Sequence, residues 1–200
     1  MKKTQVERAL DFSKKAGIFR LSEAIDHGIH QQTIQRLSKR GLINREGRGL
    51  YTMPDREIDI FYSLVEAQKR VPIGIICLIS ALSFYEIGTQ LPGEIWMALE
   101  KGRKPPKIEY PPIRFVHFSG ESISAGINNE RIKGIRINIT NPAKTIADCF
   151  KFRNKIGLDV AIEALRGCLK NKKCTVDELL HYSRICRIEK VIQPYIEVIL

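Results

Sequence analysis

Glutamine, arginine and lysine side chains recur at helical spacing between residues 31 and 40, and these are the side-chain types that read DNA. Glutamine matches adenine through a paired donor and acceptor, and arginine matches guanine through its donor fork. Lysine and arginine also bind phosphates, which fix register without carrying sequence information. The predicted DNA contacts are Gln31, Gln32, Thr33, Gln35, Arg36, Lys39, Arg40, Arg45 and Arg48.

The neighbouring pattern predicts a short helix over residues 22–27 and a second over 31–40, joined by a tight turn. Ser22 is expected to cap the first helix, because its hydroxyl can accept an unpaired backbone N–H. Gly28 follows where a helix-ending residue adopts the left-handed conformation. In the second helix, Ile34 and Leu37 share the face expected to be buried.

A hairpin rich in glycine and arginine is predicted over residues 42–51, with a flexible tip at 46–49. Two helices, a turn and a basic hairpin in this order are typical of a winged helix-turn-helix, which holds one helix in the DNA major groove. Two other interpretations stay open at this point. The segment can be an ordinary solvated helix beside an ordinary hairpin, or a winged helix that contacts only protein.

Composition and charge favour a globular protein with an anionic partner. The 200 residues are 44% apolar, which is enough for a real core, and carry a formal net charge of +11. Residues 1–55 hold 11 Lys and Arg against 6 Asp and Glu, and residues 56–200 hold 22 against 16. Double-stranded DNA is favoured over a membrane as the partner, because no basic amphipathic helix with bulky apolar anchors stands out. The basic density peaks on the predicted DNA-binding segment.

The same sequence predicts a cytoplasmic protein. The basic start lacks the apolar segment of a signal peptide, and the apolar run over 71–82 is too short to span a bilayer. The five cysteines form no Cys-x-x-Cys pair and are expected to be reduced. Neither a metal site nor a cofactor is predicted, and the histidines show no metal-ligand spacing with the cysteines.

The predicted fold class is α+β, in two domains. Residues 1–55 would form the winged helix-turn-helix domain, with a first helix over 4–15 that Thr4 and Glu7 cap. Residues 56–200 would form a mixed α+β domain with a small antiparallel sheet and C-terminal helices. Its helices are expected over 57–70, 76–85, 142–152, 158–169 and 176–183, a broken or partner-bound helix over 189–200, and strands over 95–99, 113–118 and 135–139.

No catalytic residue is predicted. The sequence has no glycine-rich nucleotide loop, no Gly-x-Ser-x-Gly and no His-Glu-x-x-His motif. Asp148 and Cys149 are adjacent but have no histidine near them in sequence, so they are interpreted as helix residues. The loop over 101–107 holds four cations, and two interpretations stay open: a solvated surface loop, or a second patch that contacts phosphates.

The chain resembles the AbiEi-type antitoxins of type IV toxin–antitoxin, or abortive-infection, systems. The resemblance covers nearly the whole chain, and each of its motifs is weak alone. It lies in the N-terminal segment that closes with Gly-Leu-Tyr at 49–51, in Leu-Ile-Ser-Ala-Leu-Ser-Phe-Tyr-Glu-Ile-Gly at 78–88, and in Asn-Pro-Ala-Lys-Thr-Ile-Ala-Asp-Cys at 141–149. Two positions depart from the family pattern: Lys144 stands where arginine is usual, and Tyr85 where histidine is common.

The resemblance implies a transcriptional repressor that binds inverted repeats near its own promoter and serves in antiviral defence. It also implies that the second domain counters a nucleotidyltransferase-like toxin. Two alternatives remain: a nucleic-acid-acting enzyme targeted by the winged helix, and a protein-interaction module that binds a toxin directly. Clustered carboxylates would favour the enzyme, and the sequence offers only the scattered Asp148, Asp159 and Glu163.

Overall fold

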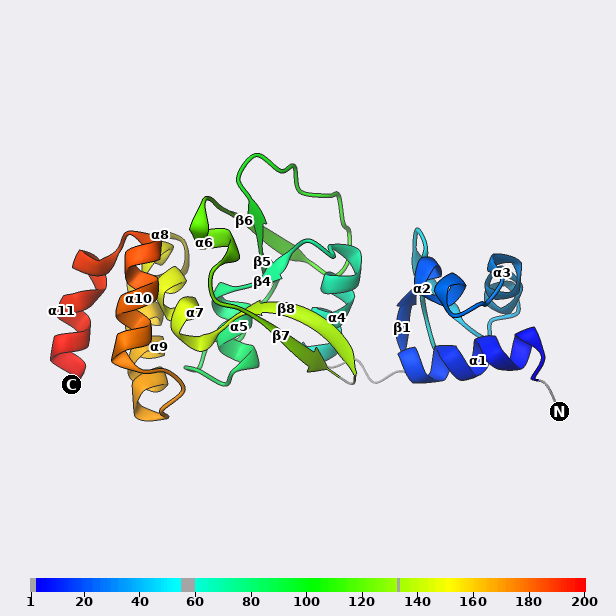
Figure 1. Cartoon of the computed structure of the whole chain (residues 1–200), viewed down its shortest axis with the longest axis horizontal. Coiled ribbons are helices and arrows are strands. Elements are labelled where there is room, and N and C mark those ends of the chain that lie inside the picture. Colours follow the sequence, from blue (N-terminus) through cyan, green and yellow to red (C-terminus); the bar gives the residue numbers. More distant parts are fainter. Residues whose placement is uncertain (1–2, 55–59, 133) are drawn as a thin grey trace. The chain divides into compact units, whose positions relative to one another are not determined.

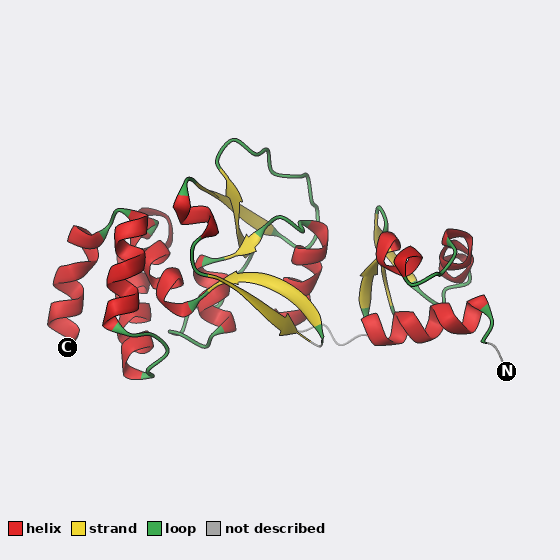
Figure 2. Ribbon diagram, in the orientation of Figure 1, coloured by secondary structure: helices red, strands yellow, loops and turns green. Residues whose placement is uncertain are grey.

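The computed structural model describes residues 3–54, 60–132 and 134–200, and these form two compact units (Figures 1 and 2). The first unit, here called the N-terminal unit, contains Met1–Pro72 and Arg131–Ile135. The second, the C-terminal unit, contains Ile73–Glu130 and Arg136–Leu200. The protein is therefore a mixed α+β structure, as the sequence predicts.

The N-terminal unit combines helices with a three-stranded antiparallel sheet of order β1-β3-β2. Its elements are α1 (Gln5–Ala16), β1 (Ile18–Arg20), α2 (Leu21–Asp26), α3 (Gln31–Lys39), β2 (Asn44–Gly47), β3 (Leu50–Thr52) and α4 (Ile60–Arg70). A single apolar cluster lies beneath α1, α2 and α3, and Phe19 and Tyr51 stack within it with ring centroids 5.9 Å apart.

The N-terminal caps of α1 and α2 are formed by different residue types. Thr4 and Glu7 form the predicted capping box at the start of α1. The prediction that Ser22 caps the next helix is wrong, because α2 begins at Leu21, directly after β1. The Glu23 carboxylate accepts the Arg20 backbone N–H there at 2.6 Å. Gly28 has φ 71°, so the predicted left-handed end of this helix is confirmed.

The predicted boundary after residue 55 falls on residues 55–59, which lie outside the described residues. The helix α4 follows them, and it belongs to the compact N-terminal unit by its contacts. The division into residues 1–55 and 56–200 therefore stays a prediction. The compact unit around the first three helices extends further along the chain, to Pro72.

The C-terminal unit is built on a five-stranded sheet of order β6-β5-β4-β8-β7, of which only the last two residues of β7 and the first of β8 are assigned to the N-terminal unit. Its strands are β4 (Ile75–Ile76), β5 (Ile95–Glu100), β6 (Ile113–Phe118), β7 (Ile127–Ile132) and β8 (Ile135–Thr140). Its helices are α5 (Leu78–Phe84), α6 (Glu121–Ser124), α7 (Pro142–Lys151), α8 (Arg153–Ile156), α9 (Leu158–Lys170), α10 (Val176–Cys186) and α11 (Glu189–Ile199). The last helix is continuous through Pro194 rather than broken.

The prediction of an antiparallel sheet in this unit is wrong, because the sheet is mixed. Strand β4 pairs antiparallel with β5 but parallel with β8, and β5 pairs parallel with β6. Parallel neighbours need a crossover connection of about a dozen residues or more. Residues 101–112, which include the basic loop, supply that connection between β5 and β6.

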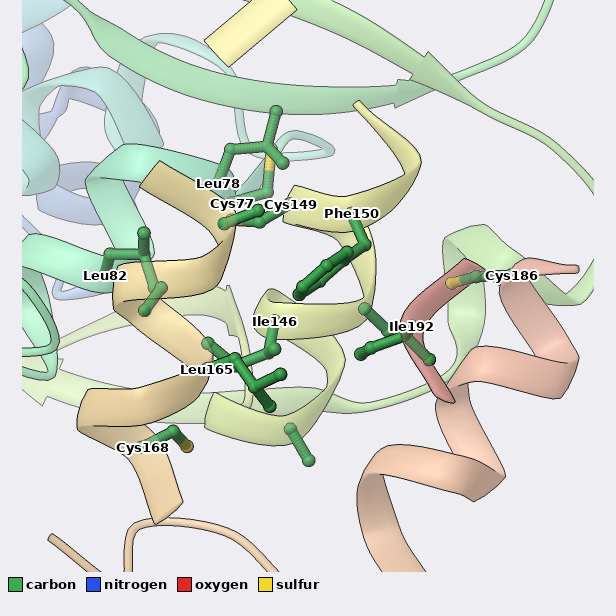
Figure 3. Packing of buried hydrophobic residues seen from close by; sticks show 14 of the residues in the cluster. Cys77, Leu78, Leu82, Ile146, Cys149, Phe150, Leu165, Cys168, Cys186 and Ile192 are labelled. Carbon is green, nitrogen blue, oxygen red and sulfur yellow. The ribbon is translucent and has the colours of Figure 1, made fainter. Parts of the chain in front are cut away.

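The core of the C-terminal unit lies around α7, which packs against α5, α9 and α10 (Figure 1). Within this core, Ile146 lies beside Leu165 of α9, and Phe150 lies toward Ile192 of α11 (Figure 3). The start of α7 is set by Asn141, whose Oδ1 accepts the Lys144 backbone N–H at 2.8 Å. This confirms the predicted asparagine cap, with Pro142 in the first turn.

A buried ion pair lies in the same core. Lys144 Nζ is 2.5 and 2.6 Å from the two carboxylate oxygens of Asp148, and neither side chain is exposed to solvent. Lys144 Nζ also lies 4.7 Å from the centre of the Phe118 ring. Burial raises the pKa of the Asp148 carboxyl, and the neighbouring lysine opposes that rise. The pair compensates two charges that would each be costly alone.

The cysteines divide into two groups. Cys168 and Cys174 form a disulfide across the α9–α10 connection, with their Cα atoms 5.9 Å apart. The expectation of five reduced thiols is therefore wrong for this pair. Cys77, Cys149 and Cys186 are free and buried. The pairing depends on the turn after α9, which brings together two positions that no Cys-x-x-Cys spacing marks.

Removing Asp148 should destabilise the fold far more than removing an exposed acid. Asp148→Ala leaves the Lys144 charge buried without a partner and should cost about 3–5 kcal/mol in the free energy of unfolding. Asp11 pairs with Lys3 at the surface, where solvent screens the two charges, so Asp11→Ala should have little effect on stability. The double variant Lys144→Met/Asp148→Leu should recover most of the loss. Urea unfolding followed by circular dichroism measures all three, and equal costs for the two single variants would contradict this account.

Candidate nucleic-acid interface

Helix α3 has one buried and one exposed face. Ile34 and Leu37 are at most 1% exposed and pack with the core residues Phe19 and Ile43. Because these apolar positions share one side of the helix, the polar side chains turn outward. The exposed predicted contacts on α3 and its C-terminal cap are Gln31, Gln32, Gln35, Arg36, Lys39 and Arg40.

Thr33 is the exception among the predicted contacts on α3. It is 8% exposed, because it lies one helical turn before the buried Leu37, on the same side of the helix. Its backbone N–H donates to His30 O at 2.9 Å in the first turn. The Thr33 side chain is thus mostly enclosed, and its predicted contact with DNA stays a prediction.

The hairpin of β2 and β3 carries the two remaining predicted contacts. Arg45 and Arg48 are both exposed, and Arg45 Nε donates to Gly47 O at 3.3 Å. The register of the pairing shifts between Arg45 and Gly47, which is a bulge at the tip. A bulge twists a hairpin and re-aims its side chains. The structure therefore presents two arginines at the end of this hairpin.

The C-terminal end of α4 braces the hairpin, and the sequence did not predict this contact. Arg70 Nη2 donates to Glu46 O at 2.8 Å and to Glu66 Oε1 at 2.8 Å. Glu66 is 1% exposed, so Arg70 neutralises a buried carboxylate while it holds β2. The signal in the sequence was the i,i+4 spacing of these two residues, which is common on solvated helices and did not indicate burial.

A second brace fixes the strand that precedes α2. Arg20 Nε donates to Lys69 O at 2.6 Å, and Arg20 Nη2 donates to Arg70 O at 3.3 Å. The ammonium group of Lys69 pairs with Glu23, the residue that caps α2. The guanidinium group of Arg20 thus binds the carbonyl groups of Lys69 and Arg70. These carbonyls lie at the end of α4 and have no partner within the helix. The helices α2 and α4 and the sheet are tied together by these polar contacts.

The basic loop over residues 101–107 is exposed along its whole length in the C-terminal unit. His117 Nε2 lies 3.0 Å from Arg103 O, and Lys101 N donates to Phe118 O at 2.7 Å, so the loop is anchored to β6 at its start. Its four cations face solvent, which is consistent with either of the two interpretations from the sequence.

The acidic residues that the sequence offers for catalysis lie in different surroundings. Asp148 is enclosed by its ion pair with Lys144, whereas Asp159 is exposed at the start of α9. The described part of the chain contains no group of three or more His, Cys, Asp or Glu side chains arranged to hold a metal ion. Among the described residues, no helix is both long and apolar enough to cross a membrane.

The N-terminal segment of the chain matches a known protein family. Residues 7–54 match the family described as transcriptional regulator, AbiEi antitoxin. The matched segment contains α2, α3 and the β2–β3 hairpin, and the resemblance seen in the sequence is thereby confirmed over this segment. A comparison with curated proteins finds no match.

The crystal structure of the RV2827C protein from Mycobacterium tuberculosis is similar to the chain in fold. The TM-score is 0.55 at 13% sequence identity, and the match covers 91% of this chain and 72% of that one. At this identity the likeness concerns the fold alone.

Arg70→Ala should weaken the N-terminal unit through two lost contacts. It leaves the Glu66 carboxylate buried without its cation, which should cost about 3–5 kcal/mol in the free energy of unfolding. It also frees the hairpin at Glu46. Arg48→Ala, which removes an exposed arginine from the same hairpin, should change stability by less than about 0.5 kcal/mol. Urea unfolding checks the pair, and an Arg70→Ala variant as stable as Arg48→Ala would show that the brace is unimportant.

Proposed function

We propose that the N-terminal unit is a winged helix-turn-helix that binds double-stranded DNA with α3 in the major groove. The observation that carries the proposal is that α3 buries one face only. Ile34 and Leu37 anchor that face in the core, and the glutamines, arginines and lysine of the other face are exposed. Those exposed side chains are the types that pair with base edges. The hairpin is the wing, and its exposed arginines would bind phosphates beside the groove.

The protein then acts as a repressor of its own promoter, at an inverted-repeat operator, in the cytoplasm. The match of residues 7–54 to regulators described as AbiEi antitoxins supports this role. A two-fold operator would be bound by two copies of the chain, each α3 reading one half-site. The chain has a net charge of +11, which favours association with a polyanion.

The proposal includes an antitoxin role, which the description of the family matched by residues 7–54 supports. In this role the C-terminal unit would counter a nucleotidyltransferase-like toxin, as the resemblance of the motifs at 78–88 and 141–149 implies. The C-terminal unit has its own core around α7, so it can present a surface of its own. In this proposal the protein carries out no reaction itself. Its two activities, operator binding and toxin neutralisation, would depend on different residues.

Substitutions on α3 and on the wing should have different effects on DNA binding. Arg36→Ala and Gln32→Ala should each cost about 1–3 kcal/mol on the operator and relax sequence preference, because a base contact is lost. Arg48→Ala should weaken operator and random DNA alike and reduce the salt slope by about one. Lys190→Ala, at an exposed position of α11, is the matched control and should leave binding unchanged. Fluorescence anisotropy with upstream DNA and with random duplex, over a salt series, measures these effects.

An unchanged operator-to-random affinity ratio in Arg36→Ala would show that α3 is not the reading helix. A flat salt response of the unsubstituted protein would refute DNA binding altogether. Contacts to six to ten phosphates would lower affinity by about 10³–10⁵ between 50 and 200 mM salt.

The two activities should separate in the full-length chain. The double variant Gln32→Ala/Arg36→Ala should lose operator repression but still rescue growth when expressed with the proposed nucleotidyltransferase-like toxin, because neither side chain supports the C-terminal core. Repression is read from a promoter fusion and neutralisation from growth. If this variant is folded yet fails to rescue growth, neutralisation depends on DNA binding and the proposed separation is wrong.

A further inference from the structure

A cavity of about 470 Å³ lies in the C-terminal unit. It is bounded by the β6–α6 connection and by the C-terminal ends of α7 and α10. The side chains that matter for its chemistry are Ser122, Lys151, Arg184, Cys186 and Arg187. Its volume is within the range of sites that bind small molecules.

The lining carries an excess of positive charge. It contains three cations, Lys151, Arg184 and Arg187, against the single carboxylate of Glu121. Arg184 Nε already pairs with Glu189 at 2.8 Å. In the described ranges of the chain, neither Lys151 nor Arg187 forms an ion pair. A concave surface with unneutralised cations attracts anions.

Cations at the ends of helices also have a simpler role, since they offset the helix dipole. Here the carbonyls at those ends have other donors. Ile188 N donates to Ser183 O at 2.8 Å at the end of α10, and Arg153 Nη1 donates to Phe150 O at 2.9 Å at the end of α7. Lys151 instead donates across the cavity wall to Ser122 Oγ at 3.3 Å.

A chain of polar contacts runs from this wall into the core. Ser122 Oγ lies 3.9 Å from Cys186 Sγ, and that thiol donates to Asp148 Oδ1 at 3.4 Å. Asp148 in turn holds Lys144. Burial, together with the Asp148 charge, raises the pKa of Cys186 to about 11, so the thiol is a neutral donor at physiological pH. The buried ion pair thus orients the residues beneath the cavity.

We propose that this cavity binds a phosphoryl group, held by Lys151 and Arg187. A phosphoryl dianion presents several oxygens and makes short, charge-assisted hydrogen bonds with lysine and arginine. The lining has no aromatic side chain on which a nucleobase could stack. The site therefore recognises the phosphoryl group itself, either as free phosphate or as the monoester of a small molecule.

Isothermal titration of the full-length protein tests the proposal with inorganic phosphate and with glycerol 3-phosphate, at constant ionic strength set by chloride. We expect saturable one-site binding of at least one of the two, and the tighter ligand identifies the source of the group. Lys151→Ala and Arg187→Ala should each weaken binding about tenfold or more. Arg166→Ala, which removes an exposed cation of α9 outside the lining, should leave it unchanged.

Thermal unfolding with and without phosphate tests whether Lys151 binds the anion or only supports the fold. Phosphate should raise the melting temperature of the unsubstituted protein and of Arg166→Ala, but not of Lys151→Ala. Absence of saturation with both ligands would overturn the proposal. So would equal weakening by Arg166→Ala, or equal stabilisation of all variants by phosphate, because either result would reflect general charge rather than this cavity.

Discussion

The account depends on one packing constraint, the burial of a narrow apolar face of α3. Ile34 and Leu37 lie a turn apart and enter the same core as Phe19 and Tyr51. Fully burying an aliphatic side chain of this size contributes about 1.5–3 kcal/mol, so rotating the helix about its axis would be costly. The orientation of the outward glutamines and arginine is therefore set by the core and not by their own contacts.

Buried charges supply the second constraint, and an ion pair with a buried carboxylate lies among the described residues of each compact unit. Arg70 neutralises Glu66 while it holds the hairpin, and Lys144 neutralises Asp148 beneath the cavity. Breaking such a pair is expensive because one charge stays buried, although the intact pair need not add much stability. These pairs position neighbouring residues: the strand that carries Arg45 in one unit, and the wall that carries Ser122 and Cys186 in the other.

Local signals in the sequence predicted most of the helices and the strands β5, β6 and β8, but not the equally long strand β7. The Thr4 and Asn141 caps and the left-handed Gly28 depend only on near neighbours, and the structure confirms them. Short strands were missed because their pairing is non-local: β1 pairs with β3, and β4 lies within an apolar run whose periodicity also fits a helix.

In the candidate site too, the features that depend on near neighbours in the sequence were predicted, and those that depend on distant residues were not. Helical periodicity was enough to separate Gln32 and Arg36 from Ile34, but it did not detect that Thr33 turns inward. The brace from Arg70 to Glu46 joins residues 24 positions apart, and no local pattern encodes it. The parallel pairing of β5 with β6 was missed for the same reason, since the direction of a partner strand is set by the whole sheet.

The most direct measurement of the central claim is amide chemical-shift mapping of the labelled full-length protein during titration with a duplex from its own upstream region. If α3 lies in the major groove with the wing beside it, the largest perturbations should fall on residues 31–40 and 44–50. Residues of the C-terminal core around α7 should change little. Perturbations that leave α3 unaffected and gather on another surface, such as residues 101–107, would contradict the account.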